Sequence, residues 1–363
     1  MAIKVIQWAT GSVGTWSLRE ILRNPDLELV GLLVYGADKV GQDAGVIAGG
    51  APVGVKATNR REDIVALDAD VVIHSPRAFG QGDRMLDDVV ALLESGKNVV
   101  TVSDYIAPQI HGPAVRERLD AAAKRGGVTL HGTGIDPGFL CDRLPATLTG
   151  LSTVVERIHM VEAADLRGHP NPSMIMDLLG FGLFPEQFRI DPSHPGIQYC
   201  ATMFPQALVS LFSLLRMPLG RIDTAPPVLA VASHDLEVAS GIVRKGTIAG
   251  ITWKFLGYRP DDPADRPFAT HQWSWYLESA LPGMPEADGR YQIRLDIEGT
   301  PTLSTVIDIR HPEDPFFMPT AGAAIRAIPE VLRAPPGFLE GTVFGAWSPS
   351  LTGRSTPTSR SRP

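Results

Sequence analysis

The feature that most constrains how this chain can fold is its N-terminus, where residues 3–22 predict a strand, a tight turn and a helix. A short apolar run leads directly into Ala9-Thr-Gly11-Ser-Val-Gly14, and a helical pattern follows until Pro25. This order of elements is typical of the opening of a dinucleotide-binding unit. We therefore expect the first part of the chain to hold a nucleotide cofactor.

Each glycine of this turn has an expected structural role. Gly11 would let the backbone approach a pyrophosphate, and Gly14 would let the helix pack closely on the strand. The free N–H groups at the helix start would hold the negative charge. Ala9 stands where the motif usually has its first glycine, so an ordinary turn whose glycines serve only packing is the alternative. The predicted cofactor-binding residues of this turn are Thr10, Gly11, Ser12, Val13 and Gly14.

Composition narrows the class of protein. A chain of 363 residues exceeds what one core usually supports, so we expect two domains. The net charge of -7 argues against nucleic acid or an anionic membrane as a partner. The two cysteines, Cys141 and Cys200, fit a reducing compartment, and the nine histidines show no close ligand spacing, so we predict no metal site. Neither a signal peptide nor a membrane-length apolar run is visible, and the cytoplasm is the expected location.

Periodicity predicts an α/β fold with two different sheets. Apolar runs alternate with helical patterns up to about residue 140, which indicates an N-terminal Rossmann-like parallel sheet. Beyond residue 150, alternating apolar and polar residues predict a C-terminal α+β domain with a mostly antiparallel sheet. Strands are expected at 3–6, 27–35, 70–74, 98–102, 128–131, 228–238, 250–258, 269–278, 292–297 and 303–309, and helices at 84–93, 113–124, 204–215 and 321–332. The predicted division is a dinucleotide-binding domain at 1–145, a substrate and dimerisation domain at 146–320, a C-terminal helix at 321–347 that packs on the first domain, and a disordered tail at 348–363.

The end of the second strand bears on which nicotinamide cofactor is bound. Lys39 could pair with a 2′-phosphate, which favours NADP, whereas Asp38 could bind the ribose of NAD. Both could also be plain loop residues. Tyr35 is a candidate to stack on the adenine, or else to cap the core. At the end of a later strand, His74, Ser75 and Pro76 are expected beside the nicotinamide ribose. His74 could act as an acid or base, or serve only as a structural hydrogen-bond donor.

Four motifs in order carry a family resemblance. They are Gly11-Ser-Val-Gly14, residues 40–45, Gly132-Thr-Gly-Ile-Asp-Pro-Gly138-Phe139 and residues 321–337. Together they resemble the 2,4-diaminopentanoate dehydrogenase and native amine dehydrogenase group of the dihydrodipicolinate-reductase-like superfamily. The His-His pair and the Lys-x-Asp-Ala-Pro-Ser-Gly-Thr segment of true dihydrodipicolinate reductases are missing from the sequence. The resemblance implies a Rossmann domain, an α+β substrate domain, a homodimer and NAD(P)H-linked chemistry at a carbon–nitrogen bond.

The resemblance also points to one catalytic residue. Amine dehydrogenases of this group use a Glu just after the strand that ends here at Val102, and the matching carboxylate is Asp104. An Asp reaches about 1.3–1.5 Å less far than a Glu, and a misplacement of about 1 Å can cost on the order of a hundredfold in rate. Tyr105 is the neighbouring alternative, and a simple cap or turn role for Asp104 is also open.

Substrate-binding residues are expected in two further segments. Gly134 should approach the nicotinamide through its backbone, and Asp136 could bind an ammonium group or only organise its own turn. His169 and Asn171 lie in the segment 163–171, which is a candidate pocket wall. Aromatic and methionine side chains nearby could line an apolar pocket, or belong to the core or to a dimer interface; they are Met174, Met176, Phe184, Phe188, Met203 and Phe204.

Three functions are compatible with these patterns. The first is an NAD(P)H-dependent amine dehydrogenase that interconverts a small amine and its carbonyl compound. The second is a carbonyl, alcohol or cyclic-imine reductase that needs no ammonia. The third is a nucleotide-binding protein without turnover, because a fold does not fix a function.

Overall fold

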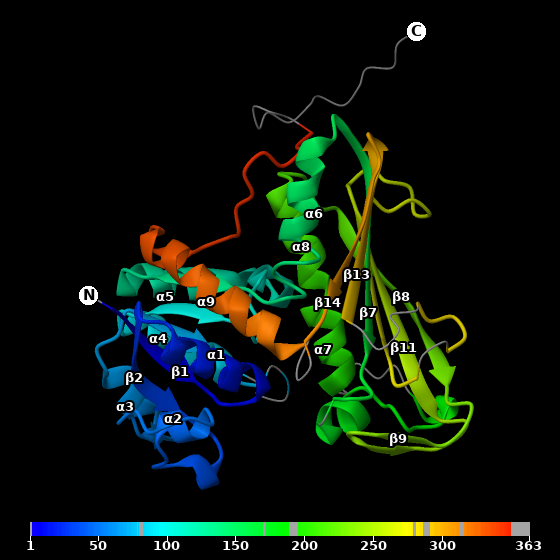
Figure 1. Ribbon diagram of the computed structural model, residues 1–363. Helices are drawn as coiled ribbons and strands as arrows, with labels where there is room; N and C mark the ends of the chain where they lie inside the picture. The colour runs from blue at the N-terminus through cyan, green and yellow to red at the C-terminus, as the bar shows by residue number, and fades with distance from the viewer. Residues whose placement is uncertain are drawn as a thin grey trace.

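The computed structural model describes residues 2–77, 79, 83–169, 171–188, 195–278, 281–285, 291–311 and 316–349. It contains two large sheets, with helices between them and on the outer faces of the first sheet (Figure 1). The predicted tail residues 350–363 lie outside the described part of the chain. No helix in that part combines the length and the apolarity that a membrane crossing requires.

The first sheet has seven strands, all paired in parallel, in the order β15-β6-β5-β4-β1-β2-β3. Its central strands are almost fully buried because helices cover both faces. The strands are β1 (Ile3–Trp8), β2 (Leu27–Leu33), β3 (Ala57–Thr58), β4 (Val71–His74), β5 (Asn98–Thr101), β6 (Thr129–Gly132) and β15 (Gly337–Phe338). This arrangement confirms the predicted Rossmann-like parallel sheet. The short strands β3 and β15 carried no recognisable pattern.

Six helices accompany this sheet. They are α1 (Ser12–Arg23), α2 (Ala44–Ile47), α3 (Arg61–Ala66), α4 (Arg84–Glu94), α5 (Pro113–Gly126) and α9 (Phe317–Arg333). The last of them returns from the far end of the sequence to pack on α1 and across β4, β5 and β6 (Figure 1). It spans residues 317–333 only, because Pro335 and Pro336 follow, so the helix is shorter than the segment 321–347 that was expected.

The second sheet has six strands in the order β14-β13-β7-β12-β11-β8. They are β7 (Val154–Asp165), β8 (Arg221–Val231), β11 (Ile248–Tyr258), β12 (Ala269–Tyr276), β13 (Tyr291–Thr300) and β14 (Leu303–Ile309). Only the β7–β12 pair is parallel among these neighbours, so the predicted mostly antiparallel sheet is confirmed. The helices α6 (Arg143–Leu148), α7 (Pro195–Met203) and α8 (Pro205–Leu214) lie between the two sheets (Figure 1).

One expectation about this half was wrong, and one strand was missed. The single strand expected at 228–238 is two elements, because β8 ends at Val231 and β9 (Leu236–Val238) forms a hairpin with β10 (Gly241–Val243). The long central strand β7 was not predicted, although its alternate residues Ile158, Met160 and Ala164 are all buried. Its position in the middle of the sheet makes it the strand that organises the site.

Candidate active site

The turn after β1 has the geometry of a dinucleotide loop. A Cβ on Gly14 would lie 2.2 Å from the Ala9 carbonyl oxygen and 2.7 Å from Ser75 Oγ, so only glycine lets α1 pack this closely on the sheet. A Cβ on Gly11 would meet no atom within 4 Å, which leaves open space beside the start of α1. Ala9 has a φ of 77°, the conformation that glycine favours at this place. These features fit a bound nicotinamide dinucleotide.

The remaining residues predicted at the cofactor gather around this loop. Lys39 Nζ donates to the Thr10 carbonyl oxygen at 3.0 Å and lies 3.2 Å from Thr10 Oγ1. Ser12 is exposed and Val13 half-buried at the N-terminus of α1. The exposed Tyr35 accepts a hydrogen bond from Trp8 Nε1 at 2.9 Å. The positive charge of Lys39 therefore lies at the loop where phosphates are expected.

The end of β4 is fully enclosed. His74 is 0% exposed, its Nδ1 lies 3.0 Å from Thr101 Oγ1, and burial lowers its pKa to about 3. The imidazole is therefore neutral at physiological pH. Ser75 Oγ donates to the Trp8 carbonyl oxygen at 3.2 Å, and Pro76 accepts from Ser103 Oγ at 2.6 Å. These contacts tie the carboxyl ends of β1, β4 and β5 together.

Asp104 follows β5 and is buried. Its Oδ1 accepts hydrogen bonds from the Tyr105 backbone N–H at 2.6 Å and from Gln206 Nε2 at 2.8 Å. His111 Nε2 lies 2.9 Å from Asp104 Oδ2. Burial lowers the pKa of His111, but the hydrogen bond and charge of Asp104 outweigh burial and raise the pKa above its ordinary value. Asp104 and His111 thus form a half-enclosed ion pair.

A cavity of about 140 Å³ lies where the two sheets meet, and we call it the site cavity. Val13, Val102 and Gly134 reach it from the segments that follow β1, β5 and β6. Aromatic and sulfur-containing side chains from the other elements form much of its wall; they are Met174, Tyr199, Met203, Phe204, Trp275, Tyr291, Phe316 and Phe317. Since ligands of open parallel sheets bind beyond the carboxyl ends of the strands, this cavity is the candidate substrate pocket.

Three strands of the second sheet bring a group of buried ionisable side chains to this cavity. Glu162 on β7 accepts hydrogen bonds from Trp275 Nε1 at 2.5 Å and from the Tyr291 hydroxyl at 3.0 Å. Asp136 Oδ2 lies 2.8 Å from His271 Nε2, and neither side chain is more than 1% exposed. Both carboxyl groups line the cavity. Asp136, expected to bind an ammonium group or organise a turn, is therefore already paired with an imidazole.

The pKa values in this group move in opposite directions. Burial and the neighbouring Asp136 charge raise the pKa of Glu162 well above its ordinary value. Burial also disfavours ionised Asp136, but the charge and hydrogen bond of His271 outweigh it and lower that pKa. Burial likewise opposes protonation of His271, yet Asp136 raises its pKa above the ordinary value. The favoured state is an Asp136–His271 ion pair beside a protonated Glu162.

The fold also brings Cys141 to this group. Its sulfur, a carboxylate oxygen of Asp136 and a nitrogen of His271 all lie within 4.8 Å of one another, a set that sequence spacing did not reveal. Burial and the Asp136 charge raise the pKa of Cys141 well above its ordinary value, which opposes the thiolate that a metal would need. The Asp136–His271 contact already uses the imidazole nitrogen. We therefore assign no metal to this cluster.

The predicted residues of the segment 163–171 separate in space. His169 is 2% exposed, lines the site cavity and packs edge-on against Phe317 at a centroid distance of 5.2 Å. Asn171 is exposed, and its Oδ1 accepts from the Met174 backbone N–H at 3.3 Å at the start of η4 (Ser173–Leu178). Pro170 lies outside the described residues. Met174, Met203 and Phe204 line the site cavity, whereas Phe184 is exposed.

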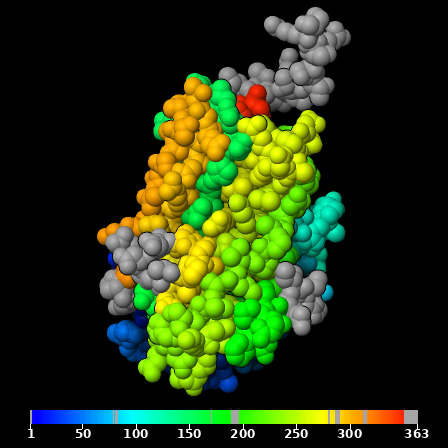
Figure 2. All heavy atoms as spheres, turned by 90° about the vertical axis from the view of Figure 1, so that its right-hand side faces the viewer, coloured from blue at the N-terminus to red at the C-terminus, as the bar shows by residue number. Residues whose placement is uncertain are grey.

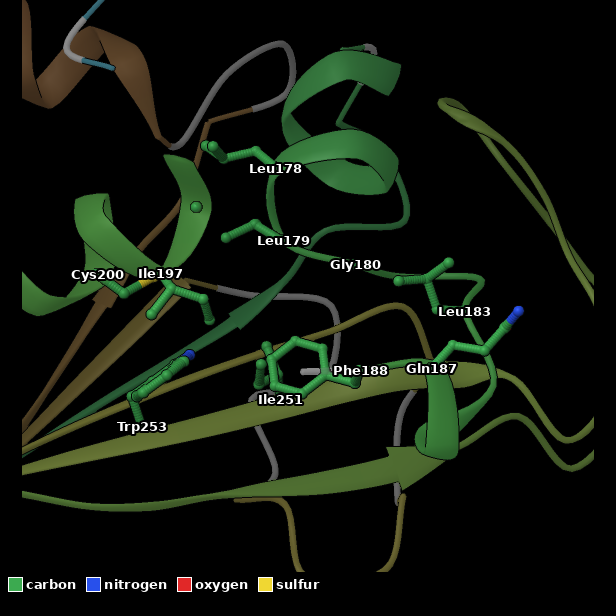
Figure 3. A pocket seen from close by; sticks show the side chains of 11 residues that line it. Leu178, Leu179, Gly180, Leu183, Gln187, Phe188, Ile197, Cys200, Ile251 and Trp253 are labelled. Atoms are coloured by element: carbon green, nitrogen blue, oxygen red, sulfur yellow. The ribbon is translucent and has the colours of Figure 1, made fainter. Parts of the chain in front are cut away.

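A second cavity of about 270 Å³ lies on the other side of α7 (Figure 3). Ile251 and Trp253 on β11 form one wall, and Ile197 and Cys200 on α7 face them. Tyr199, one residue before Cys200, points to the site cavity instead. The helix α7 therefore separates the site cavity, which Asp136 and Glu162 line, from a cavity whose described lining residues carry no charge. Burial raises the pKa of Cys200 to about 12, so its thiol is unreactive.

Sequence reasoning missed Glu162, His271, Trp275 and Tyr291. One signal was present, since Glu162 interrupts the buried alternation of Ile158, Met160 and Ala164. An acid on an apolar strand face is costly unless it has partners, so that position indicated a site. The partners come from β12 and β13, and their registers with β7 could not be read from local patterns.

Comparisons of the sequence and the fold with known proteins also indicate a dehydrogenase. No family model matches the chain. The chain is 31% identical over 183 residues to an amine dehydrogenase from Streptomyces virginiae, a match that spans 50% of this chain and 51% of that protein. It is 25% identical over 356 residues to the 2,4-diaminopentanoate dehydrogenase of Acetoanaerobium sticklandii, which covers 93% of this chain and 91% of that protein.

The fold is similar to that of a solved amine dehydrogenase from Mycobacterium smegmatis. The TM-score is 0.76 at 21% identity, and the match covers 94% of this chain and 95% of that chain. The chain is thus homologous to amine dehydrogenase and to 2,4-diaminopentanoate dehydrogenase, which confirms the resemblance drawn from the motifs. These dehydrogenase homologues indicate an NAD(P)-dependent oxidoreductase.

Proposed function

We propose that this protein is an amine dehydrogenase, which converts a small or medium-sized ketone or aldehyde and ammonia to an amine, or the reverse. The observation that supports this best is the site cavity itself. There the dinucleotide loop at Val13 and the Gly134 turn meet a buried carboxyl pair and an aromatic wall. Such a pocket can hold an apolar amine and move protons with water excluded.

The cofactor would supply a hydride, and the chain supplies placement and electrostatics. Thr10, Gly11, Ser12, Val13 and Gly14 would hold the phosphates against the N-terminus of α1. The buried His74, Ser75 and Pro76 would support the nicotinamide ribose, with Gly134 beside the ring and Tyr35 at the adenine. We favour NADP over NAD, because the Lys39 ammonium lies at Thr10, within the same loop.

Reductive amination needs proton transfer at the nitrogen, and we assign this to Asp104. It lies between Val102 and Ile106, both of which line the site cavity. The His111 imidazole beside its carboxylate can exchange protons near neutral pH. We further propose that Asp136 and His169 contact the substrate from the cavity wall, and that the exposed Asn171 contributes from its rim.

One observation keeps a second function open. The Asp104 carboxylate is occupied by the Tyr105 N–H, Gln206 and His111, a set of bonds that also suits a structural turn. If it is only structural, the protein reduces a carbonyl compound or a cyclic imine without ammonia. The same cavity and cofactor loop would serve that reaction.

The deciding experiment measures NADPH oxidation with a panel of ketones and aldehydes, with and without ammonium. We expect turnover that depends on ammonium, and a loss of at least about a hundredfold in Asp104→Ala, the usual contribution of a general acid or base. Asp87→Ala is the matched control, because Asp87 is an exposed carboxylate that forms a surface ion pair with Arg118. Turnover without ammonium, unchanged in Asp104→Ala, would favour the reductase instead.

We propose a homodimer in a reducing compartment such as the cytoplasm. The outer face of the second sheet forms one broad side of the molecule (Figure 2). It carries the exposed side chains of Val228 and Val306, each about half accessible. Cys141 and Cys200 are both free and buried, as expected where thiols stay reduced. Sedimentation velocity measures the oligomeric state directly.

A further inference from the structure

The three central strands of the second sheet place the buried polar side chains of the site on one face. Glu162 on β7 lies opposite Trp273 on β12 and Ile293 on β13. Residues two positions away on a strand point to the same face, so His271, Trp275 and Tyr291 share it with Glu162. This face is the one that borders the site cavity. The clustering is therefore set by strand register, which holds side chains more rigidly than a loop does.

One carboxylate oxygen of this group has no N–H or hydroxyl donor among the described residues. Both oxygens of Glu162 accept bonds, from Trp275 and from Tyr291. Asp136 Oδ2 is bound to His271, whereas no N–H or hydroxyl donor among the described residues reaches the buried Asp136 Oδ1. The groups beside this carboxylate are the Glu162 carboxyl and the Cys141 thiol, which is a weak donor. Two adjacent buried carboxylates cannot both ionise at low cost. A proton on Glu162 satisfies Asp136 Oδ1 and removes the repulsion at once.

We propose that Glu162 is the general acid of this site, held protonated by the Asp136–His271 pair, and that it gives its proton to the oxygen that leaves during amine formation. This inference rests on the proposed function and deepens it, since Asp104 was assigned only the protons on nitrogen. Two carboxylates held in different protonation states by their surroundings are a known way to divide acid and base work.

The step balances in atoms and charge. Ammonia and the carbonyl compound form a neutral carbinolamine, and Glu162 protonates its hydroxyl oxygen. The carbon–oxygen bond breaks, water leaves, and the nitrogen lone pair forms the carbon–nitrogen double bond of an iminium cation. The new Glu162 carboxylate is then the counter-ion of that cation. A bound NAD(P)H would supply the hydride that converts the iminium cation to the neutral amine, and Glu162 would take a proton back from the solvent.

The surroundings define the substrate class. Aromatic rings attract cations through their faces, and Tyr199, Phe204 and Trp275 line the cavity together with Phe316 and Phe317. The cavity of about 140 Å³ is similar to engineered protein cavities of roughly 150 Å³ that bind benzene. We therefore infer a primary amine on a ring or branched carbon group of about that size.

Protonation in the cavity can be measured without turnover. Cyclohexylamine, which is a cation near neutral pH, should bind and force Glu162 to ionise, so that about one proton is released per protein molecule. Calorimetric titration in buffers with different ionisation enthalpies counts that proton, with and without NADP⁺. Neutral cyclohexanol is the comparison and should release none. The other titratable groups around Glu162 are Asp136, His271, Tyr291, Tyr199 and Cys141. Asp136→Asn should reduce the release, because the Asp136 charge keeps Glu162 protonated, whereas Cys141→Ser should leave the release in place.

Glu162→Gln is the main variant because the amide keeps the shape and can donate to Asp136. We expect it to stay folded, to lose the proton release and to form amine at least about a hundredfold more slowly. Glu162→Asp should restore part of both. Proton release that persists in Glu162→Gln, or cyclohexylamine binding to the wild type without any release, would overturn the proposal, and so would absence of binding.

A second measurement covers the case in which Glu162→Gln does not fold. Infrared difference spectra of the wild-type protein, with and without cyclohexylamine, should show the carbonyl band of a protonated carboxylic acid disappear on binding. A band that never appears would refute a protonated Glu162. If ammonium-dependent turnover is missing but proton release and the band are present, the proposed function fails and with it the role in amine formation, while the protonated state of Glu162 stands.

Discussion

Alanine substitutions at Gly14 and at Gly11 should distinguish the two roles of the dinucleotide loop, which are helix packing and cofactor binding. The Cβ of Gly14→Ala would lie 2.2 Å from the Ala9 carbonyl oxygen and 2.9 Å from its carbon, and these backbone atoms belong to a buried strand end. At Gly11 the same methyl would meet nothing within 4 Å. The two variants therefore add the same methyl group at a closely packed position and at an open position of one loop.

The expected magnitudes differ accordingly. Overpacking a closed core costs roughly 1–3 kcal/mol, and a clash with backbone atoms puts Gly14→Ala at about 3 kcal/mol. For a domain of about 150–250 residues, a loss of about 3 kcal/mol lowers the melting temperature by roughly 6–12 °C. Gly11→Ala should lose no more than about 1 kcal/mol, the cost of a poorer helix cap. Its methyl would instead occupy the space where the pyrophosphate approaches, so NADPH affinity should fall at least tenfold.

The assay is thermal unfolding of both variants without cofactor, together with NADPH titration followed by fluorescence. The reasoning predicts that stability falls mainly in Gly14→Ala and that Gly11→Ala melts normally but binds poorly. A normal melting temperature for Gly14→Ala would show that α1 shifts without cost. Unchanged NADPH affinity in Gly11→Ala would mean that the cofactor does not approach this loop.

Two further predictions concern charged side chains. Asp104 raises the folded-state pKa of His111 above its ordinary value of 6.5. The protonated imidazole therefore contributes its full stabilisation of the fold below about pH 6.5. This contribution is lost as the pH rises through the raised pKa. Urea unfolding should therefore show that His111→Gln loses more stability at about pH 6 than at about pH 9, and an equal loss at both would contradict the ion pair. Lys39→Ala should weaken NADPH binding about tenfold, the value of one favourable charge contact, while NADH binding changes less; an equal effect on both cofactors would argue against contact with the 2′-phosphate.

The cofactor half of the molecule could be predicted because its information is local. The order of strand, turn and helix is written in adjacent residues, and Gly14 has the close contact that the pattern requires. Even the departure from the motif is explained locally, since Ala9 adopts a φ of 77° without being glycine. Such a backbone conformation in an alanine costs about 1–2 kcal/mol, which the surrounding loop must offset.

The acid group could not be predicted in the same way because it is assembled by long-range pairing. Glu162 could have been noticed from its place on an apolar strand face. His271 follows Glu162 by 109 residues in the sequence, and Tyr291 follows it by 129 residues. They lie beside Glu162 because the strands pair in the order β13-β7-β12. Asp104 shows the opposite case, since the resemblance selected the residue but gave no hint of Gln206, which reaches its carboxylate from α8.

The return of α9 and β15 to the first sheet has a consequence for how the protein is made. Ile325, Ile328 and Val331 of α9 belong to the same buried cluster as Val5, Ile73 and Val100. On the ribosome, the strands β1 to β6 emerge long before α9, so the part of the apolar face that α9 covers stays exposed while the whole second sheet is synthesised. The cofactor half is therefore not a fragment that can be cut away after β6 and kept soluble. Its completion waits for the second half, which links cofactor binding to synthesis of the substrate pocket.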